Sequence, residues 1–402
     1  MKKPEVLSPA GNLEKLRFAV EYGADAVYLG GRIFNLRERA GNFSVEEMAE
    51  GIEYAHSRRK KVYVTLNAFA KNRDFDELKA YVKEVASLKP DSFIVSDLGI
   101  LSLVKEVAPE VDIHVSTQAN VTNYKAVEIF KALGVKRVVL ARELSIPEIA
   151  EIKERVPDVE LEVFVHGAMC MAYSGRCLLS DYLTYRASNK GACSQSCRWK
   201  YYVVEEKRPG EFYEIEEDSK GTYIFNSKDL CALPVLPELV KAGVDSFKIE
   251  GRVKSAYYVA VVTSVYRKAV DLLFKSPEEF KRSVPFLMEE LKKVSHRPYT
   301  LGFLVPEKKE IKQHYESSSY IRNYQFLAVY DGSFWNVKNR FSVGEEVEVF
   351  QPGVKVQKVK VESIALLDNL EFIEEVHPNY RVKISFDRAV EITPYAILRK
   401  RK

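Results

Sequence analysis

The chain has 402 residues and a mass of 46.0 kDa, which predicts one large domain with a smaller one. Hydrophobic residues make up 46% and aromatic residues 11% of the sequence, enough for a packed core and too many for a disordered chain. The net charge of +4 permits an anionic partner such as RNA without requiring one, and the apolar runs are too short or too broken to predict a membrane span.

The first two thirds of the chain alternates short apolar runs, typical of buried strands, with amphipathic segments of helical period. The expected strands are residues 5–11, 26–31, 62–69, 92–99, 112–120, 137–145, 161–170 and 246–252. Helices are expected between them, among others at 12–23, 75–89, 123–134 and 145–156. Eight such units predict an α/β protein with a TIM-type (β/α)8 barrel. A doubly wound open sheet is the alternative, but no G-x-G-x-x-G follows the first strand.

In such a barrel the carboxyl ends of all strands meet at one rim, where active sites are built. Polar residues and glycines lie at these ends, namely Ser8, Gly30, Gly31, Asn67, Asp97, Thr117, Gln118, Arg142, Glu143, His166, Glu250 and Arg252. Strands must also exit into polar loops, but Gln, Arg and His so close to the last apolar residue favour a site at this rim.

The barrel is expected to span residues 1–275, with an insertion at about 170–231. Residues 276–323 are expected to form a helical and linker segment. From about residue 324 the hydrophobic period changes to two, and Gly, Asn and Asp divide the short runs. This pattern predicts a small C-terminal β-barrel domain over residues 324–402.

The cysteines are crowded. Four of the 5 lie between Cys170 and Cys197, and the last is Cys231. The N-terminal segment MKKPEVLSPAG has no apolar run typical of a signal peptide, so we expect a cytoplasmic chain whose reduced thiols serve metal binding or redox chemistry. The spacing lacks the C-x-x-C of structural zinc sites and favours an iron–sulfur cluster with ligands from wider loops. Zinc and nucleophilic or incidental thiols are the alternatives.

Residues 160–180 read ELEVFVHGAMCMAYSGRCLLS, a segment that resembles the defining motif of the peptidase U32 family. The matching positions are Glu162, Phe164, Gly167, Cys170, Gly175, Cys177 and Ser180. Further matching segments are SPAGNLEKLRFAVEYGADAVYLGG, FNLRERAGNF, VSTQANVTN, NKGACSQSCRWKY, SKDLC, KIEGRVKSAYYVA and RPYTLGF. The resemblance covers residues 1 to about 303, and a β-rich end is typical of longer members.

Despite the family's name, the resemblance implies a protein that acts in the hydroxylation of RNA or of quinones and that carries a [4Fe–4S] cluster. The most similar branch makes 5-hydroxyuridine at the wobble position of tRNA, a process tied to prephenate supply, while other branches act on ribosomal RNA or ubiquinone. The implied ligands are Cys170, Cys177, Cys193 and Cys231, with Cys197 spare, although some relatives use a cysteine at that place. The implied partners are tRNA and either a second family member or a redox partner.

Prephenate would bring two carboxylates, which guanidinium groups hold well. The expected substrate-binding residues are Arg37, Arg142, Gln118 and Asn120, the amides for a uracil edge, and the expected catalytic residues are Glu250, Arg252 and His166. Each arginine can instead form an ion pair with its neighbouring Glu38, Glu143 or Glu250. Likewise, Glu250 can be a general acid/base or the partner of Arg252, His166 a polar strand cap, and the amides an inert lining.

For RNA binding, CRWKYY offers Arg198 and Lys200 for phosphates and Trp199 for stacking, although a strand with alternating faces explains these residues equally well. The C-terminal β-barrel is a second expected tRNA contact. A peptidase is the less favoured alternative because neither H-E-x-x-H nor G-x-S-x-G occurs, which leaves a pair of Cys170 and His166. A non-catalytic RNA-binding or scaffold protein is the third class.

Overall fold

The structure is a computed structural model. It describes residues 2–34, 41–169, 179–186, 194, 196, 217–218, 221–222, 228–305, 320–367 and 370–402. The chain divides into two compact units. The first comprises Met1–Val20, Asp25–Lys254 and His296–Ile321, and the second comprises Glu21–Ala24, Ser255–Ser295 and Arg322–Lys402.

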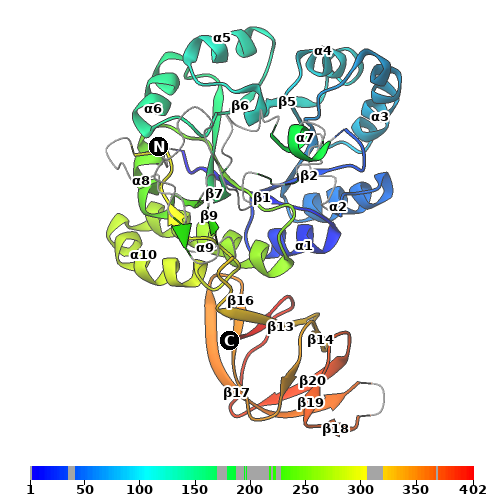
Figure 1. Ribbon diagram of the computed structural model, residues 1–402, viewed down its shortest axis with the longest axis vertical. Coiled ribbons are helices and arrows are strands. Elements are labelled where there is room, and N and C mark those ends of the chain that lie inside the picture. The colour runs from blue at the N-terminus through cyan, green and yellow to red at the C-terminus, as the bar shows by residue number, and fades with distance from the viewer. Residues whose placement is uncertain are drawn as a thin grey trace, which may run out of the picture. The chain divides into compact units, whose positions relative to one another are not determined.

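Eight parallel strands form a closed barrel in the first unit (Figure 1). They are β1 (Glu5–Pro9), β2 (Ala26–Gly30), β3 (Lys61–Leu66), β4 (Ser92–Val95), β5 (Asp112–Val115), β6 (Arg137–Val139), β7 (Glu160–Ala168) and β11 (Ser246–Ile249). Strand β11 pairs with both β1 and β7, so the ring closes. The predicted TIM-type barrel and all eight of its predicted strands are therefore confirmed.

Helices connect the strands and surround the ring (Figure 1). They are α1 (Leu13–Glu21), α2 (Val45–Ser57), α3 (Phe75–Ser87), α4 (Leu98–Val107), α5 (Tyr124–Ala132), α6 (Ile146–Arg155) and α8 (Leu236–Lys241). Several begin at polar side chains that accept a hydrogen bond from the first turn: Ser44 before α2, Asp97 before α4 and Asn123 before α5. These caps fix where each loop at the carboxyl end of a strand stops and its helix begins.

Two short strands extend the sheet beside β7, and the sequence did not predict them. Strand β10 (Asp229–Cys231) pairs antiparallel with the end of β7, and β12 (Tyr299–Thr300) pairs parallel with β10. The segment between β7 and β10 contains α7 (Leu179–Thr184) and the paired strands β8 (Glu217–Asp218) and β9 (Gly221–Thr222). Strand β10 therefore returns the end of the insertion to the barrel wall.

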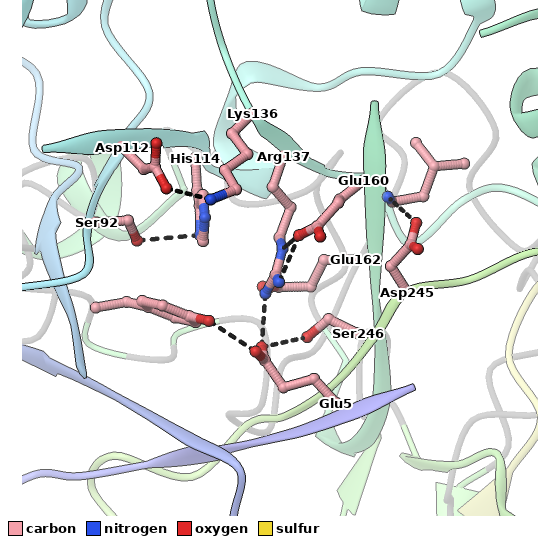
Figure 2. A network of polar contacts seen from close by, with 12 residues as sticks. Glu5, Ser92, Asp112, His114, Lys136, Arg137, Glu160, Glu162, Asp245 and Ser246 are labelled. Carbon is pink, nitrogen blue, oxygen red and sulfur yellow. Dashed lines mark hydrogen bonds and ion pairs between the residues drawn. The ribbon is translucent and has the colours of Figure 1, made fainter. Parts of the chain in front are cut away.

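A layer of charged side chains fills the barrel near the amino ends of its strands (Figure 2). Arg137 of β6 lies 2.6 Å from Glu5 of β1 and 3.1 Å from Glu162 of β7, and Lys248 of β11 lies 2.7 Å from Glu162. Because these residues come from strands around the ring and still meet, they must point inward. Burial lowers the pKa of Arg137, but Glu5 and Glu162 outweigh it and raise this pKa overall.

His114 of β5 lies in the same layer, where its Nδ1 is 3.1 Å from the hydroxyl of Ser92. Burial lowers the pKa of His114 well below its ordinary value, and the positive charges of Arg137 and Lys248 lower it further. The imidazole is therefore neutral at physiological pH. The amino end of a TIM barrel contributes stability rather than chemistry, so we assign this layer a structural role.

The second unit combines α9 (Ala256–Lys275) and α10 (Pro277–Leu291) with a closed barrel of antiparallel strands. The barrel strands are β13 (Tyr324–Tyr330), β14 (Trp335–Val337), β16 (Glu346–Gln351), β17 (Lys355–Leu366), β20 (Arg381–Phe386) and β21 (Ile397–Arg401). Strand β18 (Phe372–Ile373) pairs with β17, and β15 (Phe341–Ser342) pairs with β19 (Glu375–Val376). The predicted C-terminal β-barrel is confirmed.

A buried ionic cluster joins the helices of the second unit to its strands. Arg399 is fully buried and lies 2.5 Å from Glu290 of α10 and 2.8 Å from Glu348 of β16. The ring of Tyr257 on α9 stacks on that of Phe326, with centroids 5.5 Å apart. These contacts place α9 and α10 with the small β-barrel, whereas the predicted ranges ended the large barrel at residue 275.

In the part of the chain that the structure describes, no helix has the length and hydropathy needed to span a membrane.

Candidate functional site at the carboxyl rim

Arg142 and Glu250 face each other at the carboxyl rim of the barrel. Arg142 follows β6, and its Nη1 donates a 3.1 Å hydrogen bond to the carbonyl oxygen of Ala168 at the end of β7. Its Nη2 lies 3.8 Å from the carboxylate of Glu250, and the guanidinium sits 4.0 Å from the centre of the Phe164 ring. The alternative to substrate binding by Arg142 was an ion pair with Glu143, and the structure shows an ion pair with Glu250.

Arg252 lies in the loop after β11 and is buried, with 3% of its surface exposed. Its Nη2 donates a 2.7 Å hydrogen bond to Oδ1 of Asn42, and its Nη1 donates a 3.3 Å bond to Oγ1 of Thr65. A Cβ atom on Gly30 would lie 2.5 Å from this Nη2, so only glycine leaves room for the guanidinium. Asn42 and Thr65 thus orient the guanidinium of Arg252, a group suited to holding an anion.

Gln118 and Asn120 lie at the carboxyl end of β5. Gln118 belongs to the short helix η2 (Thr117–Ala119) and is 8% exposed. Asn120 ends this helix in the left-handed conformation, with φ 56° and ψ 45°, which asparagine adopts more readily than most residues. The two predicted amides are therefore neighbours on the rim, with side chains of different burial.

His166 lies in a buried aromatic group on β7. Its ring centre is 5.3 Å from that of Tyr299, which stacks on His296 at 4.8 Å. Burial lowers the pKa of His166 to about 3, with further contributions from His296 and Lys254. The imidazole is therefore neutral at physiological pH and can serve as a hydrogen-bonding group.

Cys231 is the one predicted ligand within the described residues. It is 2% exposed and pairs with His166 across β10 and β7. Burial raises the pKa of Tyr299, and the nearby Cys231 and Asp229 raise it further. Asp229 pairs with Ala168 in the same antiparallel register, so Cys231 lies beside β7 opposite a residue four positions before Cys170 in the sequence. A buried thiol at this point fits the chemistry of a thiolate-held cluster.

The remaining predicted residues lie outside the described residues, namely Cys170, Cys177, Cys193, Arg37, Arg198, Trp199 and Lys200. Among the residues that the structure does describe, there is no group of three or more His, Cys, Asp or Glu side chains placed to hold a metal ion. The described residues include only one of the four predicted cysteine ligands, so a single cluster site shared by the four thiols stays a prediction.

The sequence did not single out four residues that the structure places in the site. Asn42 and Thr65 orient Arg252, Tyr299 covers His166, and Phe303 lines a small pocket beside Arg142. Two motifs carried a signal: Asn42 lies in FNLRERAGNF, and Tyr299 and Phe303 lie in RPYTLGF. The residue types alone did not distinguish these positions from ordinary loop residues.

Comparison with known families identifies the chain. The model of peptidase family U32 matches residues 11–314, and the model of the family's C-terminal domain matches residues 322–399. The chain belongs to peptidase family U32. The first match covers the large barrel together with α9 and α10, and the second covers the β-barrel of the second unit.

Relatives of this U32 chain have names from RNA modification. It is 43% identical to "tRNA hydroxylation protein P1" of Bacillus subtilis, over 100% of this chain and 96% of the relative. It is 41% identical to "tRNA hydroxylation protein P" of Escherichia coli, over 88% and 87% of the two chains. A more distant relative, "23S rRNA 5-hydroxycytidine C2501 synthase" of Escherichia coli, is 34% identical over 76% of this chain and 46% of its own.

Proposed function

We propose that this U32 protein is an RNA hydroxylase whose substrate is tRNA and whose product is 5-hydroxyuridine at the wobble position. The observation that carries the proposal is the 43% identity to a tRNA hydroxylation protein along the whole chain. The distant relative named as a ribosomal RNA hydroxycytidine synthase supports hydroxylation of RNA as the common chemistry. The polar carboxyl rim, with Arg142, Glu250 and Arg252, is the part of this barrel suited to chemistry.

The proposal includes a [4Fe–4S] cluster held by Cys170, Cys177, Cys193 and Cys231. The burial of Cys231 and its position beside the end of β7 support it. When bound, the cluster would supply an iron centre for electron transfer or Lewis-acid chemistry.

The proposed co-substrate is prephenate, which carries two carboxylates. Arg252 would bind one of them, because Asn42 and Thr65 hold its guanidinium in a fixed orientation. Arg142 would bind the other while Ala168 and Glu250 hold it in place. The carboxylate of Glu250 lies close enough to this anion site to exchange a proton with a substrate there.

The uracil ring needs hydrogen-bonding groups that read its edge. Gln118 and Asn120 are the proposed groups, since amide side chains both donate and accept hydrogen bonds. Gln118 is the better placed to fix an orientation, because burial restrains its side chain. These roles require only that the base enters the mouth of the barrel.

Nucleoside mass spectrometry tests the proposed function. A strain that lacks the gene would lose 5-hydroxyuridine from its tRNA, and a plasmid copy of the wild-type gene would restore it. Ribosomal RNA from the same strains serves as the second substrate. An unchanged tRNA profile with loss of hydroxycytidine from ribosomal RNA would exclude tRNA as the substrate, and no change in either would exclude RNA hydroxylation. Gelatin cleavage by iron-free protein would instead support the peptidase.

A further inference from the structure

The loop after β1 lies directly against the main chain of Arg252. A Cβ atom on Gly11 would lie 2.0 Å from the carbonyl oxygen of Arg252, so only glycine fits at this position. The loop after β2 joins them, since a Cβ atom on Gly41 would lie 3.2 Å from the carbonyl oxygen of Gly11. Strand β1 lies between β11 and β2 in the ring, which brings these three loops together at the carboxyl rim (Figure 1).

Lys15 reaches the same point from the first turn of α1. Its ammonium group donates a 3.3 Å hydrogen bond to the carbonyl oxygen of Arg252. An ammonium group has three N–H donors, so this bond leaves two of them for another acceptor. The side chain is half-buried, so part of it remains accessible at the rim. Lys15 is therefore placed to contact a ligand that also contacts Arg252.

No carboxylate among the described residues forms an ion pair with the ammonium group of Lys15. Burial lowers its pKa, the exposed Glu14 raises it, and the positive charge of Arg252 lowers it further, so that the pKa lies below its ordinary value. Glu250, two residues before Arg252, lies 3.8 Å from the guanidinium of Arg142. A half-buried cation that lacks an ion pair and feels a second cation favours the binding of an anion beside it.

We propose that Lys15 is a further substrate-binding residue, which together with Arg252 binds one oxyanion at the carboxyl rim. The inference rests on the proposed function for the source of this oxyanion, which is a carboxylate of the co-substrate or a phosphate of the RNA. The carboxylate is favoured because Arg252 is 3% exposed, and a small acid reaches a buried guanidinium more readily than a polynucleotide does. Arg252, held by Asn42 and Thr65, orients the anion, and Lys15 contributes a second charge and movable donors.

Calorimetric titration of the anaerobically purified full chain with prephenate, and separately with inorganic phosphate, tests the inference. Lys15→Gln keeps a side-chain donor for the carbonyl oxygen of Arg252 but removes the charge, and it is expected to weaken anion binding about 10- to 100-fold. Lys15→Arg keeps the charge and should retain most of the affinity. The matched control is Lys241→Gln, which should bind like wild type, because Lys241 is exposed at the end of α8, near the amino end of the barrel.

Two results identify the source of the anion. Tighter binding of prephenate than of phosphate assigns the site to the co-substrate. Phosphate binding that displaces tRNA, with no binding of prephenate, assigns it to the RNA backbone. In either case the loss of affinity in Lys15→Gln supports the inference.

Wild-type affinity of Lys15→Gln for both anions would overturn the inference, because Lys15 would then act only through its hydrogen bond to the main chain. Failure of the wild-type protein to bind either anion would overturn it as well. Measuring 5-hydroxyuridine in a deletion strain that carries the same plasmids separates the two proposals. If wild type restores the nucleoside while Lys15→Gln binds anions normally, the hydroxylase stands and the Lys15 site does not. If wild type restores nothing while Lys15→Gln still weakens anion binding, the site stands and the hydroxylase fails.

Discussion

The amide oxygen of Asn42 accepts a 2.7 Å hydrogen bond from the guanidinium of Arg252 and so connects the loop after β2 to the loop after β11. Asn42 itself is 7% exposed, and Thr65 of β3 accepts a second bond from the same guanidinium. The loop after β2 and strand β3 thereby hold the guanidinium of Arg252, in the loop after β11, in one orientation.

Replacement of Asn42 by alanine is expected to slow 5-hydroxyuridine formation about 10- to 100-fold, because Arg252 would lose its orientation. The measurement is the rate of nucleoside accumulation after the variant is induced in a deletion strain. Asn42→Asp keeps the acceptor but places a negative charge beside the guanidinium, so it should raise the concentration of the proposed co-substrate prephenate that is needed for half-maximal rate. The exposed Asn72→Ala is the control. Wild-type rates in both Asn42 variants would contradict a role for Arg252 in anion binding.

Replacement of Cys231 by serine is expected to reduce the iron and sulfide content of anaerobically purified protein, because a hydroxyl is a poor ligand for iron. Cys197→Ser is the matched variant, since Cys197 is the predicted spare thiol. It should keep its cluster and its visible absorption. The reverse result, with the cluster lost in Cys197→Ser and kept in Cys231→Ser, would reassign the fourth ligand.

Replacement of Glu162 by glutamine is expected to lower the free energy of unfolding by about 3–5 kcal/mol, because it leaves two buried cations without their shared carboxylate. Lys248 and Arg137 lie 2.7 and 3.1 Å from Glu162, which is fully buried. The control is Glu128→Gln, which breaks an exposed ion pair with Lys125 and should cost less than about 1 kcal/mol. Urea denaturation followed by circular dichroism compares the two. A similar small cost for both would show that the layer contributes little to stability.

The buried imidazole of His114 predicts a pH dependence. The pKa of His114 is lowered by burial, so below pH about 6.5 the unfolded chain takes up a proton at this residue that the folded chain does not. The free energy of unfolding should therefore fall by up to about 1.4 kcal/mol for each pH unit below about pH 6.5. Above this pH His114 is neutral in both the folded and the unfolded chain, so its contribution to stability is complete. His114→Asn should show a shallower decline between pH 6.5 and pH 5, roughly the range in which this uptake occurs. The exposed His377→Asn is the control, and an identical slope in His114→Asn and wild type would refute the prediction.

The sequence was sufficient for the eight barrel strands because buried parallel strands read as apolar runs, as in residues 62–66 and 92–95. Helix starts were also readable, since Ser145 was predicted as the start of α6 and precedes it in the structure. Strands β10 and β12 could not be predicted, because two or three residues show no period and their pairing depends on β7.

Residue types at the strand ends placed Arg142, Glu250 and Arg252 on the rim, but their partners depended on which strands are neighbours. Strand β7 lies between β6 and β11, which brings Arg142 to Glu250. The inner charged layer was missed for a related reason. Charged residues such as Glu162 and Lys248 are usually exposed, and only the closed ring shows that they neutralise one another inside.

The charged layer also determines which end of the barrel is open to substrate and product. Side chains from seven strands contact one another near the amino end and close the ring there. Because the ring is filled at its amino end, substrate and product must enter and leave through the opposite opening. Entry and exit then follow one another in time, and release of the finished product becomes a step that can limit the turnover of the whole cycle.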